Sequence, residues 1–465
     1  MPQRIVIIGG GPAGYEAAVV AAELGAEVTI VSDEGLGGNC VLWDCVPSKA
    51  LIVAAQARGQ LSAAAEVGAV HESVAEGEVD FPRIGRWVLG LGAEQSVDIE
   101  SRIAAAGVRR ITGRGRISGD HRVTATDADG GVEELAADHV LVATGSRARV
   151  LPFFTPDRER ILLGQDVYEL PELPEHLVVV GSGATGAEFA HAFRRLGSEV
   201  TLVSSREHIL PTEDPDAAEV IEDVFERRGM RILRRSRAVS CRREGDDVVV
   251  GLDRDDAEVV GSHVLFTVGQ VPASADLGLE RCGVEVNRWG GIDVDAVGRT
   301  SKPWVYAAGD VTNRLMLASV AAMQGRTAMW HALGEALQPI RWDAVAATIF
   351  TDPEVATVGL SPAEADEAGF RVRTARLDFR NNPRAKMIDA LDGFVKVHAM
   401  VGSGTVVGGV VVSSRASELI QPLAIAVQHR MTVSQLAQAI TVYPSMAGSV
   451  AEAARMLMAG DEPRR

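Results

Sequence analysis

Two glycine-rich turns, each lying between a short apolar strand and a helix, constrain the fold of this chain more than any other feature. The turns read GGGPAG at 9–14 and GSGATG at 181–186. The apolar runs around them are Ile5–Ile8 and Val28–Val31 for the first turn, and Leu177–Val180 and Val200–Val203 for the second. One such turn is a weak signal. Strand, turn, helix and strand occurring twice favour two dinucleotide-binding units over a duplication with one inactive copy.

Each turn supplies three glycines with separate tasks. One makes the tight turn, one lets the backbone approach a pyrophosphate, and one lets the helix pack closely on the strand. The pyrophosphate then lies at the positive end of the helix dipole. The candidate residues are Gly9, Gly11 and Gly14 in the first unit, and Gly181, Gly183 and Gly186 in the second. For either turn alone, the alternative is a tight strand-to-helix connection without a ligand.

The residues after the second strand of each unit indicate which ribose is bound. Asp33 follows the first unit's strand, and a carboxylate there holds ribose hydroxyls. The second unit has Ser204, Ser205 and Arg206 instead, with Glu207 further along. Without a carboxylate at the strand tip the site does not repel a 2′-phosphate, and Arg206 could pair with one, so NADPH is at least tolerated. The alternative is that Arg206 is an ordinary solvated side chain.

Length and charge limit the classes of function. A chain of 465 residues exceeds what one hydrophobic core usually serves, so two or three domains are expected. The 46 Lys and Arg against 63 Asp and Glu give a formal net charge of -17, which disfavours nucleic acid and anionic membrane surfaces. A small-molecule partner fits better. We find no signal peptide and expect no membrane span, and the use of only four cysteines predicts a cytoplasmic protein.

Cys40 and Cys45 form a close pair in GLGGNCVLWDCVPSK. No second Cys or His pair lies at metal-ligand spacing, so we predict a redox couple and no metal site. At the start of the following helix, Cys45 is expected to feel a dipole that favours the thiolate. The alternative is two free thiols packed as small apolar groups. Cys241 and Cys282 are isolated and are expected to be structural.

The chain resembles the class I flavoprotein disulfide reductases, the pyridine-nucleotide family of dihydrolipoyl dehydrogenase and glutathione reductase. The supporting strings are GGGPAG, GGNCVLWDCVPSK, VLVATGS, GSGATGAEFA, VYAAGD and FTDPEVATVGLSPAEA. The expected fold class is α/β, with two Rossmann-like dinucleotide-binding domains and a C-terminal α+β dimerisation domain. The resemblance implies an FAD-binding domain at 1–150 and 270–340, an NAD(P)-binding domain at 151–269, and a domain at 341–465 that forms a homodimer.

The same resemblance assigns roles to individual residues. Cys40 resembles the interchange thiol and Cys45 the thiol in charge-transfer contact with the flavin. Lys49 and Glu188 resemble the ion pair beside the flavin's reactive nitrogen. Further contacts are expected from Gly38, Thr144, Gly145, Gly309 and Asp310 to FAD, with Thr144 and Gly145 in the adenine-side turn and Asp310 on the ribityl chain, and from Glu188 and Gly269 to NAD(P).

One departure from the family pattern bears on function. Disulfide reductases of this family carry a C-terminal His-Pro and a Glu that protonate the leaving thiolate from the partner subunit. Here Tyr443 stands at the His position and Gly448 at the Glu position. A phenol with an ordinary pKa near 10 is a poor proton shuttle at neutral pH, and losing such an acid costs roughly a hundredfold to ten-thousandfold in rate. The Trp43-Asp44 pair before Cys45 also departs from the pattern, and one expected consequence is narrower access to the thiols.

The strings LASVAAMQGRTAMWHALG and RAKM, with the Tyr-Pro-Ser ending, resemble actinobacterial lipoamide-dehydrogenase-like NAD(P)H:quinone reductases. The resemblance implies hydride transfer from NAD(P)H through FAD to a quinone-like acceptor. One alternative is a disulfide reductase in which Tyr443 or water is the acid, since both cysteines of the pair are present. Others are a non-catalytic flavin redox sensor and a carboxylating oxidoreductase of the family.

Overall fold

The first sheet lies at the N-terminal end of the molecule. The computed structural model describes residues 1–75, 77–254 and 257–458. In the sheet order β17-β6-β1-β2-β3-β4-β5, the five strands from β17 to β3 are parallel, and β3, β4 and β5 form an antiparallel meander. Their bounds are β1 Arg4–Ile8, β2 Glu27–Ser32, β3 Arg109–Gly119, β4 Arg122–Asp127, β5 Val132–Ala136, β6 His139–Val142 and β17 Val305–Ala307. Pairing of β17 with β6 brings the chain back to this sheet after the second unit.

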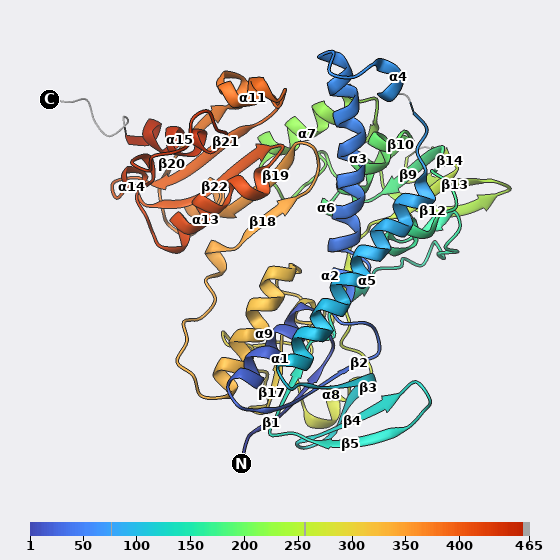
Figure 1. Cartoon of the computed structure of the whole chain (residues 1–465), viewed down its shortest axis with the longest axis vertical. Coiled ribbons are helices and arrows are strands. Elements are labelled where there is room, and N and C mark those ends of the chain that lie inside the picture. The colour runs from blue at the N-terminus through green and yellow to red at the C-terminus, as the bar shows by residue number, and fades with distance from the viewer. Residues whose placement is uncertain (76, 255–256, 459–465) are drawn as a thin grey trace.

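Helices α1 (Pro12–Glu23) and α9 (Ala318–Ala332) pack together against this sheet. Their backbones are in close contact, because a methyl group on Gly325 would lie 2.1 Å from the carbonyl oxygen of Ala13. The run RIVII in β1 is buried after its first residue, as expected for a parallel strand covered on both faces. The short helix α8 Leu279–Cys282 and the 3₁₀ turn η2 Asp310–Thr312 belong to this part, whereas α4 Glu72–Ala75 lies at the far end of α3, Cys45–Glu66 (Figure 1).

A second parallel sheet, in the order β11-β10-β9-β15-β8, forms the other dinucleotide unit. One of its faces packs on α6 (Ala184–Leu196) and α7 (Pro215–Arg227), and the other packs on a three-stranded antiparallel sheet. The strands are β8 Ile161–Leu162, β9 His176–Val180, β10 Glu199–Val203, β11 Arg231–Leu233, β12 Ala238–Glu244, β13 Asp247–Leu252, β14 Glu258–Gly261 and β15 His263–Phe266. The two-stranded pair β7 Ser146–Ala148 and β16 Gln270–Pro272 lies where the chain enters and leaves this unit, and η1 Gly164–Glu169 follows β8.

The C-terminal part is an antiparallel sheet in the order β18-β19-β22-β21-β20, packed on α13, α14 and α15. Its strands are β18 Ala346–Ile349, β19 Glu354–Gly359, β20 Val372–Asp378, β21 Phe394–Met400 and β22 Val406–Ser413. Its helices are α10 Pro362–Glu367, α11 Pro383–Met387, α12 Ala416–Leu419, α13 Gln421–Gln428, α14 Val433–Ala437 and α15 Gly448–Met458, with 3₁₀ turns η3 Trp342–Ala344 and η4 Phe379–Asn381.

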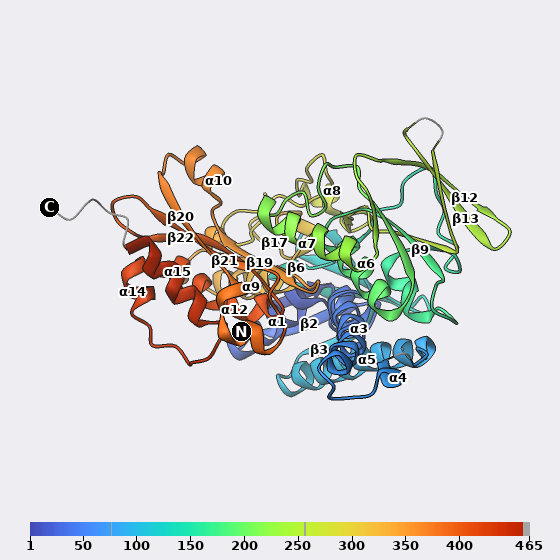
Figure 2. The ribbon, with the colours of Figure 1, turned by 90° about the horizontal axis from the view of Figure 1, so that it is seen from above.

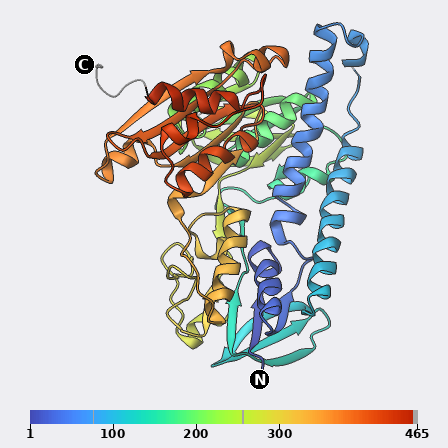
Figure 3. The ribbon, with the colours of Figure 1, turned by 60° about the vertical axis from the view of Figure 1, so that its left-hand side comes forward.

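Two long helices, α3 (Cys45–Glu66) and α5 (Phe81–Ala105), connect the three parts. In Figure 1, α3 stands between the C-terminal sheet on the left and the second unit on the right, and α5 runs down to the first sheet, while Figure 3 shows the two helices side by side. Seen from above in Figure 2, the second unit and the C-terminal sheet lie on opposite sides. One apolar core nevertheless joins them, since Phe193 on α6 and Phe394 on β21 belong to the same buried cluster as Leu51 on α3.

One helical stretch of 29 residues among the described residues, Gly38–Glu66, has the length and composition of a membrane span, and an 18-residue window in it has a mean hydropathy of 1.3. It comprises α2 (Gly38–Leu42) and α3, and α3 packs against α5 and α6. It also carries Asp44 and Lys49, which lie in the site described below. We therefore regard it as an internal helix of this fold.

The expected fold class is confirmed. The glycine turns lie between β1 and α1 and between β9 and α6, with β2 and β10 following. The third part has the expected mixture of strands and helices, of which the last seven residues of the 341–465 range lie outside the described residues. The sequence did not predict α5.

Candidate functional site

The three glycines of the first turn have three different environments. Gly9 has φ +111°, and a methyl group on it would lie 2.2 Å from the carbonyl oxygen of Ala143. A methyl group on Gly14 would lie 2.0 Å from the Gly9 carbonyl oxygen, so this glycine lets α1 pack on the turn. Gly11 has nothing within 4 Å of that position. Gly11 is thus the place where another group can approach the backbone at the start of α1.

The second turn repeats this arrangement. Gly181 has φ +116°, and a methyl group on it would lie 2.5 Å from the Thr267 carbonyl oxygen. A methyl group on Gly186 would lie 1.9 Å from the Gly181 carbonyl oxygen. Gly183, at the N-terminus of α6, again has nothing within 4 Å. Two turns with one open glycine each, both at a helix N-terminus, have the geometry that a pyrophosphate requires.

Beyond β2, Asp33 is exposed, and its carboxylate accepts a hydrogen bond from Arg114 Nε at 3.0 Å. Beyond β10, Ser205 and Arg206 are exposed, and the Arg206 side chain has no bonding partner in the described part of the chain. The nearby Glu207 is paired with Arg235, so the Arg206 guanidinium remains available to an anion.

The prediction that Ser204 contacts the nucleotide needs correction. Its side chain is completely buried, and its hydroxyl lies 2.7 Å from that of Ser182. The Ser204 hydroxyl also accepts the backbone N–H of Arg206 at 3.2 Å. Ser204 therefore orders the end of β10 and does not face a ligand.

The two cysteines of the pair are free thiols on successive helices, Cys40 in α2 and Cys45 as the first residue of α3. A methyl group on Gly38 would lie 2.9 Å from Cα of Gly11, so α2 begins against the first glycine turn. The hydrogen bond between the two sulfurs lowers the pKa of Cys40 and raises that of Cys45, whose burial acts in the same direction. In the dithiol state these directions favour the proton on Cys45, whereas the helix dipole favours a Cys45 thiolate, which stays a prediction. Its position at the helix N-terminus is as expected.

Lys49 on α3 and Glu188 on α6 form an ion pair, with Nζ 2.8 Å from Oε2. The Glu188 side chain is 6% exposed, and its other oxygen accepts the backbone N–H of Phe350 at 2.9 Å. Lys49 Nζ also lies 5.1 Å from the centre of the Phe350 ring. Burial by itself lowers the pKa of Lys49, but the charges of Glu188 and Cys45 outweigh burial and raise it. Lys49 therefore brings a fixed positive charge to the cysteine pair.

Three further polar groups lie around this pair. Burial raises the pKa of Asp44, which precedes Cys45, and the charge of Lys49 only partly opposes the effect. Burial also raises the pKa of Tyr168, whose hydroxyl has no hydrogen-bond partner among the described residues. The buried Ser48 hydroxyl on α3 is likewise unpartnered there. Sequence reasoning missed Tyr168 and Ser48, and treated Asp44 only as a steric element.

Asp310 is the first residue of η2. Its carboxylate accepts a hydrogen bond from the Ser146 hydroxyl at 2.7 Å, and Asn39 Nδ2 donates to the Ser146 carbonyl oxygen at 2.7 Å. Burial raises the pKa of Asp310, although the Ser146 hydroxyl opposes the shift. These bonds connect α2, β7 and η2 around the cysteine pair.

The remaining glycine and threonine candidates lie at backbone turns. Gly145, Gly269 and Gly309 have φ of +71°, +102° and +81°. The Gly309 N–H donates to Gln324 Oε1 at 2.8 Å, and the Thr144 hydroxyl donates to the Ala273 carbonyl oxygen at 2.8 Å. The Thr144 hydroxyl thus already has an acceptor in the protein.

Within one chain, Tyr443 does not reach the cysteine pair. Its side chain is 82% exposed, and the neighbouring Pro444 lines a cavity together with Gln56 and later residues of α3. Gln56 is eleven residues from Cys45 along the helix, which corresponds to about 16 Å. Gly448 begins α15. A contact between Tyr443 and the thiols would need a second subunit.

Chemically, the site combines two thiols, a lysine charge and buried carboxyl groups next to the first of two open glycine turns. Such a set suits a two-electron exchange between a bound dinucleotide ring and the thiols or another acceptor. Among the described residues, no group of three or more His, Cys, Asp and Glu side chains is arranged to hold a metal ion.

Comparison with known families gives two matches that together cover most of the chain. Residues 3–325 match the profile described as pyridine nucleotide-disulphide oxidoreductase. Residues 345–454 match the profile of the dimerisation domain of pyridine nucleotide-disulphide oxidoreductases.

Individual relatives are similar over nearly their full lengths. The chain is 50% identical to a protein of Mycobacterium tuberculosis named NAD(P)H dehydrogenase (quinone), over 99% of this chain and 95% of that protein. It is 36% identical to a dihydrolipoyl dehydrogenase of Haloferax volcanii, over 97% of this chain and 95% of that one. The crystal structure of LpdA from Mycobacterium tuberculosis superposes with a TM-score of 0.93 at 49% identity, covering 98% of this chain and all of that one.

Proposed function

The chain belongs to the pyridine nucleotide-disulphide oxidoreductase family and is an NAD(P)H-dependent flavoprotein oxidoreductase, and from this premise we propose that its electron acceptor is a quinone. One observation carries the proposal. Disulfide reductases of the family use a His and a Glu to protonate the leaving thiolate, and this chain has Tyr443 and Gly448 at those two positions. Tyr443 lies exposed on the C-terminal part. A quinone has no thiolate leaving group, so it does not need that acid. The name of the 50% identical relative supports the same acceptor.

The two glycine turns fit the two dinucleotides of this family. Gly11 in the first turn would admit the pyrophosphate of FAD and Gly183 in the second that of NAD(P)H, because each leaves its helix N-terminus open. Bound FAD would supply the two-electron chemistry, accepting hydride from NAD(P)H and releasing electrons to the acceptor. Lys49, held by Glu188, would bring a positive charge to the ring. The unpaired Arg206 guanidinium supports use of NADPH.

Further assignments belong to the same proposal. We assign the FAD-binding domain to 1–150 and 270–340, the NAD(P)-binding domain to 151–269 and the dimerisation domain to 341–465. The return of β17 to the first sheet supports the two-segment first domain. The match of residues 345–454 supports a homodimer. The use of only four cysteines supports a cytoplasmic location.

Substrate choice tests the proposal directly. NADPH oxidation is measured with menadione and with lipoamide, for the wild type, Cys40→Ser and the control Cys241→Ser. Cys241 lies in β12, so its substitution removes a thiol outside the site. We expect menadione to be the faster acceptor, and Cys40→Ser to keep most of the menadione activity. Faster turnover of lipoamide than of any quinone would overturn the proposal.

A disulfide reductase is the second candidate, favoured by the hydrogen bond between Cys40 and Cys45. In that case Cys40→Ser abolishes turnover with the preferred acceptor, whereas Cys241→Ser does not. Anaerobic titration with NADPH adds an independent measurement. A long-wavelength absorption band indicates a thiolate against the flavin, and bleaching without such a band indicates that the sulfurs do not take part. A bound flavin that NADPH does not bleach would indicate a non-catalytic redox sensor.

A further inference from the structure

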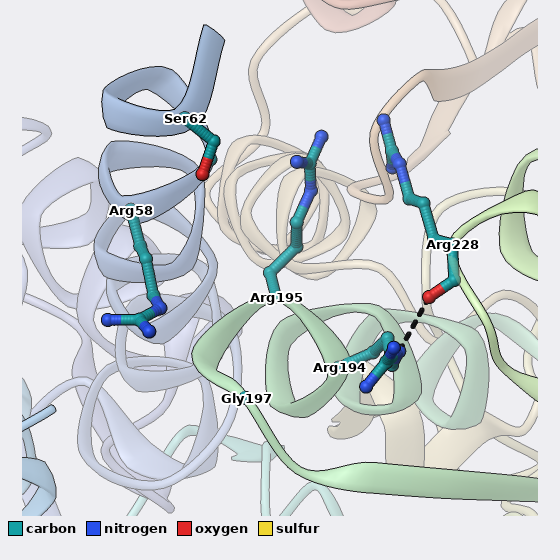
Figure 4. Close-up of a pocket in the computed structure, with 7 residues that line it drawn as sticks. Arg58, Ser62, Arg194, Arg195, Gly197 and Arg228 are labelled. Carbon is teal, nitrogen blue, oxygen red and sulfur yellow. Dashed lines mark hydrogen bonds between the residues drawn. The ribbon is translucent and has the colours of Figure 1, made fainter. Parts of the chain in front are cut away.

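A small basic cavity lies at the junction of α3, α6 and the end of α7. Its volume is about 330 Å³, and four of the seven residues that line it are arginines: Arg58, Arg194, Arg195 and Arg228. Figure 4 shows Arg58 and Ser62 on α3 facing the C-terminal end of α6, which carries Arg194 and Arg195. The remaining lining residues are Gly59, Ser62 and Gly197, so no carboxylate lines it. In a chain with a net charge of -17, this is a local excess of positive charge.

Among the described residues, two of the four guanidinium groups are bonded only to neutral oxygens. Arg58 Nη1 donates to the carbonyl oxygen of Gly77 at 2.6 Å. Arg194 donates to the carbonyl oxygens of Arg228 and Ser198, at 2.6 and 3.0 Å, and the first of these bonds is dashed in Figure 4. Carbonyl groups satisfy donors, but they do not neutralise charge.

The other two guanidinium groups share one carboxylate. Arg195 Nη2 lies 2.7 Å and Arg228 Nη2 lies 3.1 Å from the same oxygen of Asp352. Arg195 Nε is buried and has no hydrogen-bond partner among the described residues. Burial lowers the pKa of Arg228, and the charge of Asp352 only partly restores it. The four arginines therefore line one cavity, and Asp352 is the only carboxylate bonded to them among the described residues. Half-buried charges of like sign are costly unless an opposite charge joins them.

The backbone is shaped to hold this arrangement. A methyl group on Gly59 would lie 2.7 Å from Arg195 Nη1, so the glycine lets this guanidinium lie close against α3, and an alanine there would shift it. Gly197 has φ +125° and ends α6 directly after the two arginines. The larger cavity next to it, of about 1020 Å³, is lined by arginines and carboxylates together, so the charge imbalance is confined to the small one.

We propose that this basic cavity binds a small, multiply charged oxyanion of the phosphate class, free or as the phosphoryl group of a small metabolite. Guanidinium groups present paired N–H donors that match phosphate oxygens. The cavity volume is at the lower end of the range for small-molecule sites, about 300 to 1,000 Å³. Arg195 lies about 18 Å along α6 from Gly183, so the site is separate from the nucleotide pyrophosphate. The anion would tie α3, which begins with Cys45, to α6, which carries Glu188.

Calorimetric titration with inorganic phosphate tests the assignment. The FAD-loaded protein is kept at constant ionic strength with saturating NADP⁺, so that the nucleotide site is already filled. Arg58→Gln removes a cavity arginine whose only partner in the described part of the chain is a carbonyl oxygen, and Arg86→Gln, at an exposed position of α5, is the charge-matched control. We expect saturable binding that Arg58→Gln weakens by about tenfold or more, because one hydrogen bond to a charged group is lost. The control should stay within about twofold of the wild type.

Gly59→Ala provides a second test, because its methyl group displaces the Arg195 guanidinium without removing any charge. It should weaken phosphate binding in the same direction as Arg58→Gln. Pyrophosphate binding more tightly than phosphate would identify a phosphorylated metabolite as the source, and equal affinities would identify free phosphate. The proposal is overturned if no phosphate or pyrophosphate binds saturably, or if Arg58→Gln and Arg86→Gln bind with the same affinity.

Discussion

Replacing the open glycine of the second turn separates ligand binding from folding. Gly183 has φ -75° and ψ -171°, which any residue adopts, and a methyl group on it meets nothing within 4 Å. Alanine is a poorer N-cap than glycine, but it also restricts the unfolded chain, and each effect is below about 1 kcal/mol. Gly183→Ala should therefore melt within a few degrees of the wild type when no nucleotide is bound.

Nucleotide affinity should fall sharply in Gly183→Ala. The methyl group occupies the space through which a pyrophosphate approaches the N-terminus of α6. Each backbone hydrogen bond to a charged group contributes about 1.5 to 3 kcal/mol, and about 1.4 kcal/mol corresponds to tenfold. Losing one such bond predicts NADPH binding weakened by at least about tenfold, measured by fluorescence titration of the FAD-loaded protein.

Gly186→Ala is the matched contrast, because its methyl group would lie 1.9 Å from the Gly181 carbonyl oxygen. That collision involves backbone, so this variant should lose folded protein as well as binding. If Gly183→Ala binds NADPH as the wild type does, or if it melts as low as Gly186→Ala, the assignment of separate tasks to these glycines is refuted.

Two pH-dependent predictions follow from buried groups. Cys45→Ala removes the hydrogen bond that lowers the pKa of Cys40. The pH midpoint of Cys40 alkylation by iodoacetamide should therefore move to higher pH. An unchanged midpoint would show that Cys45 does not lower the pKa of Cys40. Burial lowers the pKa of His191 to about 3. The unfolded chain therefore binds more protons, and the free energy of unfolding should fall between about pH 6.5 and 3, by up to about 1.4 kcal/mol per pH unit. In denaturant titrations at pH 5 to 7, His191→Leu should reduce the dependence of the free energy of unfolding on pH. The remaining dependence includes that of His263 and His398, whose pKa values burial lowers to about 4. A dependence equal to that of the wild type would show that His191 does not stay neutral.

The sequence predicts the parts of the fold whose signals are local. Both glycine turns, their flanking strands and the start of α3 at Cys45 follow from patterns within about thirty residues. Helix α5 escapes such reading because glycines interrupt it. Those glycines mark close contacts and not helix ends, since a methyl group on Gly85 would lie 2.1 Å from the Tyr168 carbonyl oxygen and one on Gly92 2.7 Å from that of Val41.

Contacts between distant segments had no local signal. The ion pair of Lys49 with Glu188 joins residues 139 positions apart, and the sequence indicated it only through the family resemblance. Ser204 was assigned to the nucleotide from its place after a strand, and only the tertiary structure brings Ser182 to its hydroxyl. Arg58 and Arg195, which line the basic cavity, are also far apart in the sequence.

Glu188 shows why a redox site in such a chain depends on all three of its parts. One carboxylate oxygen holds Lys49 on the helix that begins with Cys45, and the other holds the backbone of Phe350 at the end of β18. Because the carboxylate is almost fully buried, losing either partner leaves charge or a donor unsatisfied in the interior. The lysine charge beside the thiols is therefore maintained only while the second unit and the C-terminal part are both packed against α3. A redox reaction at the first glycine turn therefore depends on the folding and packing of all three parts of the chain.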